Sequence, residues 1–297
     1  MADILIPTVA QGLMWALMAL GVYITFRVLD IADLSVEGSF PLGAAVAATA
    51  LVSGYGVTAA FLLAAVAGAL AGIVTGILTT KLKIPPLLAG ILTMIGLYSV
   101  NLHVMGKANV ALLRVDTVFS YAAGLGLTSD MAMMAVGLVG VMLVGVILYW
   151  FFGTEIGCGI RATGANACMA RAQGINTQRN VVVGLALSNG IAALSGALLC
   201  QYQGSADVNM GRGAIVIGLA AVIIGESLLG KVFRNFGLRM LSVSLGAIVY
   251  YLVLQVVLQL GLNTNDLKLL SAAIVAVFLA VPHLKGKLTH KGGTVHA

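Results

Sequence analysis

Charged side chains are scarce in this 297-residue chain: Asp, Glu, Lys and Arg together make up 9% of it, against about 25% in a typical soluble domain. Apolar residues reach 60%, so a soluble fold would have too few charges to cover its surface. This scarcity excludes a disordered chain, a coiled coil, a nucleic-acid-binding protein and an ordinary cytosolic enzyme. Lipid is therefore expected to surround most of the chain.

Residues suited to metal binding or catalysis are also few. The 3 cysteines and 4 histidines lack the spacing of metal ligands, and no set of residues typical of a hydrolase stands out. Gly225 to Lys231 has the spacing of a phosphate-binding loop, but Val232 stands where the loop needs a hydroxyl for Mg²⁺. We therefore expect no catalytic residue, no metal site and no bound cofactor on this chain.

The chain does have long uncharged apolar runs. Lipid allows only helices or closed barrels to span it, and barrel strands would instead alternate over about ten residues. The runs predict an all-α, polytopic transmembrane helical bundle that forms a single domain over 1–297. Because a span needs about 20 residues, about nine spans are expected, within a range of eight to ten. The predicted spans cover 4–26, 38–80 (two helices broken at 53–56), 84–106, 131–154, 180–206, 213–230, 240–265 and 269–284.

Basic residues are distributed unevenly between the predicted loops. With the N-terminus outside, twelve lie on the inner side and four on the outer side. The inner ones are Arg27, Lys81, Lys83, Arg161, Arg171, Arg179, Lys231, Arg234, Arg239, Lys285, Lys287 and Lys291, and the outer ones are Lys107, Arg114, Arg212 and Lys268. The positive-inside rule therefore predicts an outer N-terminus and a cytoplasmic tail at 283–297. No basic region precedes the first run, so we expect a retained helix and not a cleaved signal peptide.

The longest polar inner loop, 153–180, carries the signals of a short helix. Thr163 is a suitable N-cap, Arg171 stands near the end of a run of helix formers, and Gly174 suits the position after the helix. Asn176 or Thr177 is suited to cap the next span. The sequence predicts a helix over 163–173 whose small residues fit a groove on a partner.

This loop resembles the coupling region of importer permeases of the ATP-binding-cassette (ABC) class, in the group of branched-chain amino-acid and ribose permeases. Segments 25–48 and 218–230 show weaker likenesses in the same order. Within the group, the chain looks most like permeases for tryptophan, tyrosine or similar amino acids. The resemblance extends the coupling role to the residues of one helix and its flanks: Arg161, Thr163, Gly164, Ala165, Asn166, Ala170, Arg171, Gly174, Ile175 and Asn176.

The resemblance implies a permease subunit in the cell membrane that moves a small solute, an amino acid or a similar compound, by alternating access. An extracytoplasmic binding protein would deliver the solute. Separate ATPase subunits would bind ATP and Mg²⁺ and act through the coupling helix. A second permease copy, as a homodimer, and membrane lipid are the other expected partners.

Five polar residues in apolar surroundings are candidates for the solute pathway: Asp30, Asp33, Glu37, Asn101 and Asn189. A helix through the three acids would gather them on one face, either lining a discontinuous second span or flanking an inner loop beside Arg27. The two asparagines either line the pathway or bond between helices. An alternative function, an ion-coupled secondary transporter that uses the three acids, predicts inverted repeats, and no convincing repeat is visible.

Two surface features remain open on sequence alone. The predicted outer loops contain four candidates for docking the binding protein, which fit an ordinary solvated loop equally well: Lys107, Arg114, Asp207 and Arg212. Gly68, Gly72 and Gly76 recur at four-residue spacing, which predicts close helix packing, either within the subunit or between subunits.

Overall fold

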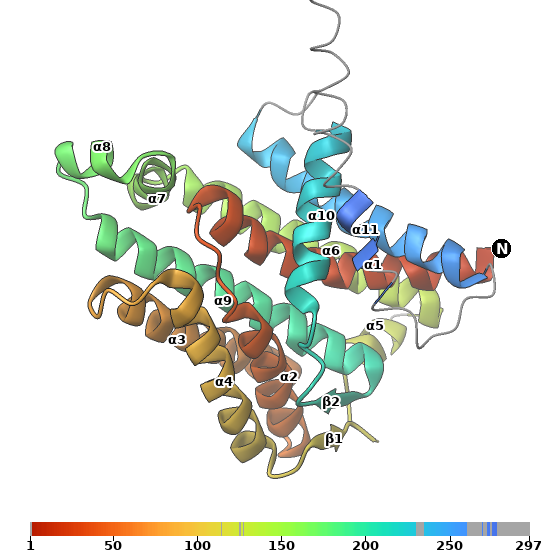
Figure 1. Ribbon diagram of the computed structural model, residues 1–297. Helices are drawn as coiled ribbons and strands as arrows, with labels where there is room; N and C mark the ends of the chain where they lie inside the picture. The colour runs from red at the N-terminus through yellow and green to blue at the C-terminus, as the bar shows by residue number, and fades with distance from the viewer. Residues whose placement is uncertain are drawn as a thin grey trace, which may run out of the picture.

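The computed structural model describes residues 2–113, 115–124, 126, 128–229, 235–259, 269, 272–273 and 275–277. This part of the chain is a helical bundle with one short β-ribbon (Figure 1). Its helices are α1 (Ala2–Tyr23), η1 (Ile24–Val28), α2 (Val36–Val52), α3 (Val57–Thr80), α4 (Pro86–Met105), α5 (Val118–Gly124), α6 (Ser129–Phe152), α7 (Glu155–Ala165), α8 (Ala167–Ala172), α9 (Thr177–Gln203), α10 (Ala214–Leu229) and α11 (Phe236–Gln259). Its strands are β1 (Asn109–Ala111) and β2 (Ser205–Asp207).

Six of the described helices are long and apolar enough to cross a membrane: α1 with η1, α3, α4, α6, α9 and α11. Two shorter apolar helices, α2 and α10, occupy the second and seventh predicted spans. The helical bundle and its first eight apolar segments are thus as predicted. The prediction for 269–284 falls largely outside the described residues, and that for the tail 283–297 falls wholly outside them.

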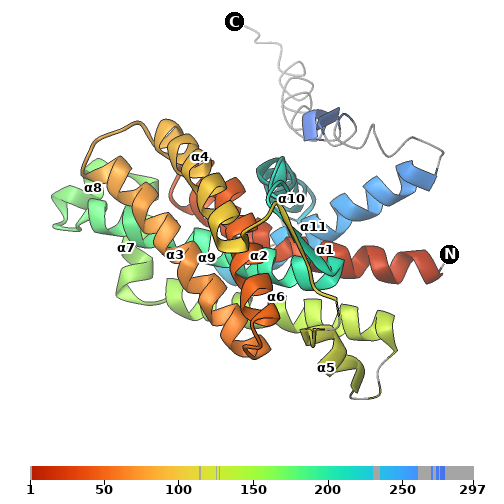
Figure 2. The ribbon, with the colours of Figure 1, turned by 90° about the horizontal axis from the view of Figure 1, so that it is seen from below.

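α9 is the central helix of the bundle and packs against α1, α2 and α3. The glycine stripe of α3 lies against it, because a Cβ at Gly72 would come within 2.7 Å of Ala186 Cα, and one at Gly76 within 2.8 Å of Val182 Cα. Backbones this close leave no room for a side chain between the helices. The stripe therefore packs within the subunit. Figure 2 shows α6 running along α1, with α8 and the N-terminus at opposite ends of the bundle.

The chain between α1 and α2 is not one continuous helix. α1 ends in the π-helical turn η1, residues 29–35 are non-helical, and Asp30 has a positive φ of 55°. The three acids therefore do not share a helical face, since only Glu37 lies in a helix. The physical reason is local: Asp33 Oδ1 accepts the backbone N–H of Ser35 at 2.9 Å, which favours a turn over a continuing helix.

Two short helices begin near the middle of the bundle. Asp33, just before α2, bonds to Asn189, which lies 12 residues after Thr177 and so about 18 Å along α9. Just before α10, the N–H of Gly213 donates to Glu37 Oε1 at 3.2 Å, in the first turn of α2. The N-terminal ends of α2 and α10 therefore lie close together.

The β-ribbon closes the end of the bundle opposite α7 and α8 (Figure 1). β1 and β2 are antiparallel, with Asn109 opposite Asp207 and Ala111 opposite Ser205. The ribbon joins the segment after α4 to the segment after α9, two regions far apart in the sequence. We refer below to the ribbon end and the α7–α8 end of the bundle.

Candidate functional site

The predicted coupling helix is two helices, α7 and α8, separated at Asn166. This residue has an extended backbone (φ −161°, ψ 100°), and its Oδ1 accepts the N–H of Met169 at 2.9 Å, which caps α8. The expectation of one helix over 163–173 capped by Thr163 is wrong. Thr163 is buried inside α7, where its hydroxyl donates to Gly159 O at 2.7 Å and accepts from Asn180 Nδ2 at 3.1 Å.

The signals after the helix are confirmed. Gly174 adopts a left-handed φ of 79°, and Ile175 N–H donates to Ala170 O at 3.0 Å, which ends α8. Asn176 caps α9, because its Oδ1 accepts the N–H of Arg179 at 3.0 Å. α8 is therefore a short helix with both ends fixed by side chains or backbone turns.

α8 presents one buried and one exposed side. Ala170 is fully buried, whereas Met169 is 57% exposed although its side chain is large and apolar. Arg171 and Ala165 are also exposed, and the Arg171 Nε–H donates to Ala167 O at 3.2 Å. The exposed side of α8 is thus apolar with one cation nearby, at the tip of the bundle.

α7 contacts the π-helical turn η1 backbone to backbone. A Cβ at Gly164 would overlap the carbonyl oxygen of Val28 and approach Leu29 Cα to 2.8 Å. Only glycine allows this approach. The Thr163–Asn180 hydrogen bond fixes the other side of α7 to the first turn of α9. α7 is therefore in contact with both η1 and α9.

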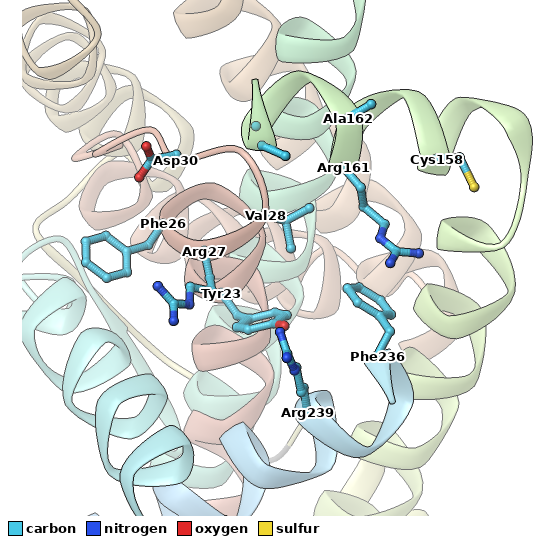
Figure 3. Close-up of a pocket in the computed structure, with 12 residues that line it drawn as sticks. Tyr23, Phe26, Arg27, Val28, Asp30, Cys158, Arg161, Ala162, Phe236 and Arg239 are labelled. Carbon is cyan, nitrogen blue, oxygen red and sulfur yellow. The ribbon is translucent and has the colours of Figure 1, made fainter. Parts of the chain in front are cut away.

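A cavity of about 760 Å³ lies between η1, α7 and α11 (Figure 3). Arg27, Arg161, Arg239 and Asp30 line it. The Arg161 guanidinium lies 5.0 Å from the centroid of the Phe236 ring, a cation–π arrangement. Arg27 Nε lies 2.8 Å from Glu226 Oε1 in α10, so it pairs with that residue and not with one of the three predicted acids.

A buried polar network lies at the middle of α9. Asn189 Nδ2 donates to Asp33 Oδ2 at 2.9 Å, and the hydroxyls of Ser35 and Ser39 reach the Asn189 amide oxygen. Ser35 also binds Asp33 through its N–H and its hydroxyl. All four residues are at most 3% exposed. The sequence singled out Asp33 and Asn189, but Ser35 and Ser39 carried no signal beyond their place in a polar stretch.

A second cavity, of about 350 Å³, lies between α2, α4 and the segment before α10. Glu37, Asn101 and Arg212 line it. Asn101 Nδ2 donates to Gly38 O at 3.3 Å, while its buried Oδ1 has no hydrogen-bond partner among the described residues.

The predicted pathway residues thus fall in three places. Asp33 and Asn189 bond to each other, Glu37 and Asn101 share the second cavity, and Asp30 lies at the α7–α8 end. The four docking candidates also separate. Lys107 and Asp207 lie at the ribbon, Arg212 lines the second cavity with Glu37, and Arg114 lies outside the described residues.

Comparison with known proteins gives matches along nearly the whole chain. Residues 4–281 match the family model described as branched-chain amino acid transport system permease component. A tyrosine transport system permease protein of Clostridioides difficile is 38% identical over 280 residues, which cover 94% of this chain and 92% of that protein. An uncharacterised protein of Rickettsia prowazekii is 32% identical over 280 residues, covering 94% of this chain and 97% of that protein.

A more distant relative is an autoinducer 2 import system permease protein of Salmonella typhimurium. It is 29% identical over 227 residues, which cover 74% of this chain and 62% of that protein. These matches agree with the multi-pass apolar helices of the structure. The chain therefore belongs to the family of permease components of branched-chain amino acid transport systems, within the ABC permeases.

Proposed function

We propose that this chain is the membrane-spanning subunit of an ABC importer for an amino acid or a similar small solute. Membership of the permease family supports transport. The relatives are named for tyrosine transport and for autoinducer 2 import, which favours a small polar solute and the inward direction. A binding protein outside the membrane delivers the solute, and two permease copies form the translocating unit.

The observation that carries this proposal is the exposed α8 helix. Both of its ends are fixed by Asn166 and Gly174, and Met169 projects from it at 57% exposure. An exposed apolar side chain on a rigid, capped helix at the tip of a membrane protein suits insertion into a groove of a partner. We assign that partner as the ATPase subunit, which binds ATP and Mg²⁺.

The coupling step follows from the packing of α7. ATP-driven closure of the ATPases moves α8 and α7, and Gly164 transfers the movement to η1 through the carbonyl of Val28. η1 precedes the non-helical segment 29–35, which is bonded to the centre of α9. The bundle then changes between outward and inward access, a two-state transition biased by the partner. Because the ATPase subunits are cytoplasmic, this proposal places the α7–α8 end in the cytoplasm and the N-terminus outside.

Met169→Glu tests the docking assignment. A buried carboxylate without a partner opposes docking, so we expect at least a tenfold loss of ATPase co-purifying with the permease. Leu113→Glu is the matched control, because Leu113 is an apolar residue 81% exposed outside the α7–α8 end, and this variant should retain the ATPase. Gly164 and Ala170 are poor choices, since both are packed against neighbours and their substitution disturbs the fold.

Equal recovery of ATPase with both variants would contradict the docking role of α8. Solute uptake in reconstituted vesicles separates the energy sources. Uptake should stop when ATP is removed and should persist when an ionophore dissipates the ion gradients. The reverse pattern would show an ion-coupled transporter instead.

A further inference from the structure

The second cavity lies where the two short apolar helices begin. Glu37 and Gly38 come from the first turn of α2, and Arg212 from the turn just before α10. Helix N-termini carry a partial positive charge. In membrane transporters, short helices that begin inside the bundle place these ends near solutes. Position alone does not make a site, so the side chains of the cavity must carry the argument.

The cavity contains one carboxylate and one guanidinium that are not paired with each other. Among the described residues, the ion pair within 4.0 Å is Arg27 with Glu226, so Glu37 and Arg212 are farther apart than that. Glu37 is half-buried and held in place by the backbone N–H groups of Gly213 and Ile215. Arg212 is exposed. Glu37 lies in the first turn of α2, near the middle of the bundle, and a charged group at the depth of a membrane is costly and typical of ion or solute paths.

Asn101 supplies an independent observation. Its side chain lines the same cavity and is only 1% exposed, yet its Oδ1 has no hydrogen-bond partner among the described residues. A buried amide oxygen without a donor costs about 1–3 kcal/mol, which a ligand with an N–H group would recover. The unpartnered oxygen is therefore a candidate acceptor for a ligand that donates hydrogen bonds.

The remaining wall is apolar and aromatic, formed by Met94, Ile95, Tyr98 and Pro41. The volume of about 350 Å³ lies in the range of small-molecule sites. A ligand that fits has a cation, an anion and an apolar portion within a few ångströms of one another.

We propose that this cavity binds a zwitterionic α-amino acid. Glu37 pairs with the ammonium group, Asn101 Oδ1 accepts a hydrogen bond from the same ammonium group, and Arg212 binds the carboxylate. The Met94–Tyr98 wall contacts the side chain. This assignment rests on the proposed import function and adds that the permease itself recognises the charges of the solute. A purely structural role for Glu37, capping α10, is the competing explanation.

Direct binding to the purified permease–ATPase complex, without a binding protein, tests the proposal. The twenty standard L-amino acids are screened by equilibrium dialysis. The tightest one is then compared with its N-acetyl and methyl-ester derivatives, each of which lacks one charge. Each derivative should bind the unmodified complex at least tenfold more weakly. Absence of binding by every amino acid, or equal binding of the derivatives, overturns the proposal.

The variants assign each charge to a residue. Glu37→Gln keeps an acceptor for the cap of α10, so it should bind the amino acid at least tenfold more weakly but treat the N-acetyl derivative and the parent alike. Arg212→Gln should also bind the amino acid at least tenfold more weakly, and it should bind the methyl ester and the parent amino acid alike. Lys107→Gln is the control, because it removes an exposed cation at the ribbon. It should leave unchanged the affinity of each derivative relative to that of the parent amino acid. If Glu37→Gln weakens all three ligands equally, Glu37 serves only as a cap and the assignment is overturned.

The readouts separate this proposal from the proposed function. Thermal unfolding confirms that each variant is folded, and ATPase co-purification does not depend on the cavity. If Met169→Glu keeps its ATPase while the charge ratios behave as expected, the cavity assignment holds and the docking assignment fails. The opposite result retains the importer and removes the cavity as the recognition site.

Discussion

At the scale of single residues, the centre of the bundle depends on one amide. Asn189 donates to the Asp33 carboxylate and accepts from Ser39, so it satisfies groups from both the non-helical segment and α2. Buried polar groups with all partners present define one arrangement, and loss of one partner leaves the others unsatisfied. The segment 29–35 has no helix or sheet of its own to hold it, so this network fixes its position.

Asn189→Leu keeps the branched shape of the side chain but removes its hydrogen bonds to Asp33, Ser35 and Ser39. We expect a loss of about 3 kcal/mol, because a buried carboxylate loses a donor, seen as a lower unfolding temperature of the purified protein in detergent. Ser244→Ala is the control, since its buried hydroxyl bonds only to Met240 O of the same helix among the residues that the structure describes, and should cost about 1 kcal/mol or less. An unfolding temperature unchanged by Asn189→Leu would show that the network contributes no stability.

The polar residues show what a sequence can and cannot predict about a membrane site. Scarcity of polar groups made Asp33, Asn101 and Asn189 candidates, and the structure buries all three. The sequence alone could not show which of them contact one another, because Asp33 and Asn189 are 156 positions apart and helix packing brings them together. Arg212 was assigned to an outer surface by its loop, and nothing in the sequence indicated that it lines the same cavity as Glu37.

At the scale of elements, capping signals predicted the ends of helices better than their continuity. Gly174 and Asn176 end α8 and begin α9 as expected. Thr163 is a residue type suited to a helix cap, but it lies inside α7, where its hydroxyl accepts a hydrogen bond from Asn180 of α9. The segment 29–37 has helical spacing of its acids, yet a local Asp–Ser turn interrupts it. Tertiary and local side-chain bonds, which spacing does not reveal, decided both cases.

The break at Asn166 is testable by hydrogen exchange. Asn166→Ala removes the cap on Met169 N–H and should destabilise α8 by about 1 kcal/mol, so amides of 167–172 should exchange about fivefold faster. Asn166→Asp keeps an acceptor and should exchange like the unmodified protein. Faster exchange in both variants would mean that the side-chain cap is not what holds α8.

The contact of α3 with α9 gives a second test at this scale. A side chain at Gly72 meets the backbone of Leu185 and Ala186, so Gly72→Val should force the helices apart and cost about 3 kcal/mol or more. Gly145→Val on α6 has no atom within 4 Å of the new Cβ and should be nearly neutral. Thermal unfolding in detergent compares the two. Equal stability would place the stripe outside the subunit core.

At the scale of the whole molecule, the basic residues separate by end. Among the described residues, seven lie at the α7–α8 end and two at or towards the ribbon end. The first group is Arg27, Lys81, Lys83, Arg161, Arg171, Arg179 and Arg239, and the second is Lys107 and Arg212. The division predicted from loop positions is therefore compatible with the helix directions of the structure, and it favours a cytoplasmic α7–α8 end.

Cysteine labelling tests this orientation. A variant whose only cysteine is Cys168, exposed in α8, should react with a membrane-impermeant maleimide only after cell lysis. A variant without native cysteines that carries Leu113→Cys should react on intact spheroplasts. Labelling in the opposite order would reverse the orientation and would place α8 out of reach of any cytoplasmic partner.

The close backbone contact between Gly164 and the carbonyl of Val28 has a mechanical consequence. Contacts made through long side chains are compliant, because rotamer changes absorb part of any displacement. A backbone-to-backbone contact has no such slack. If closure of the ATPase subunits moves α7 as proposed, this contact passes the displacement to η1 with little loss, and from there to the segment that leads to the centre of the bundle. A larger side chain at residue 164 would push α7 and η1 apart and change their relative position, even in a protein that still folds.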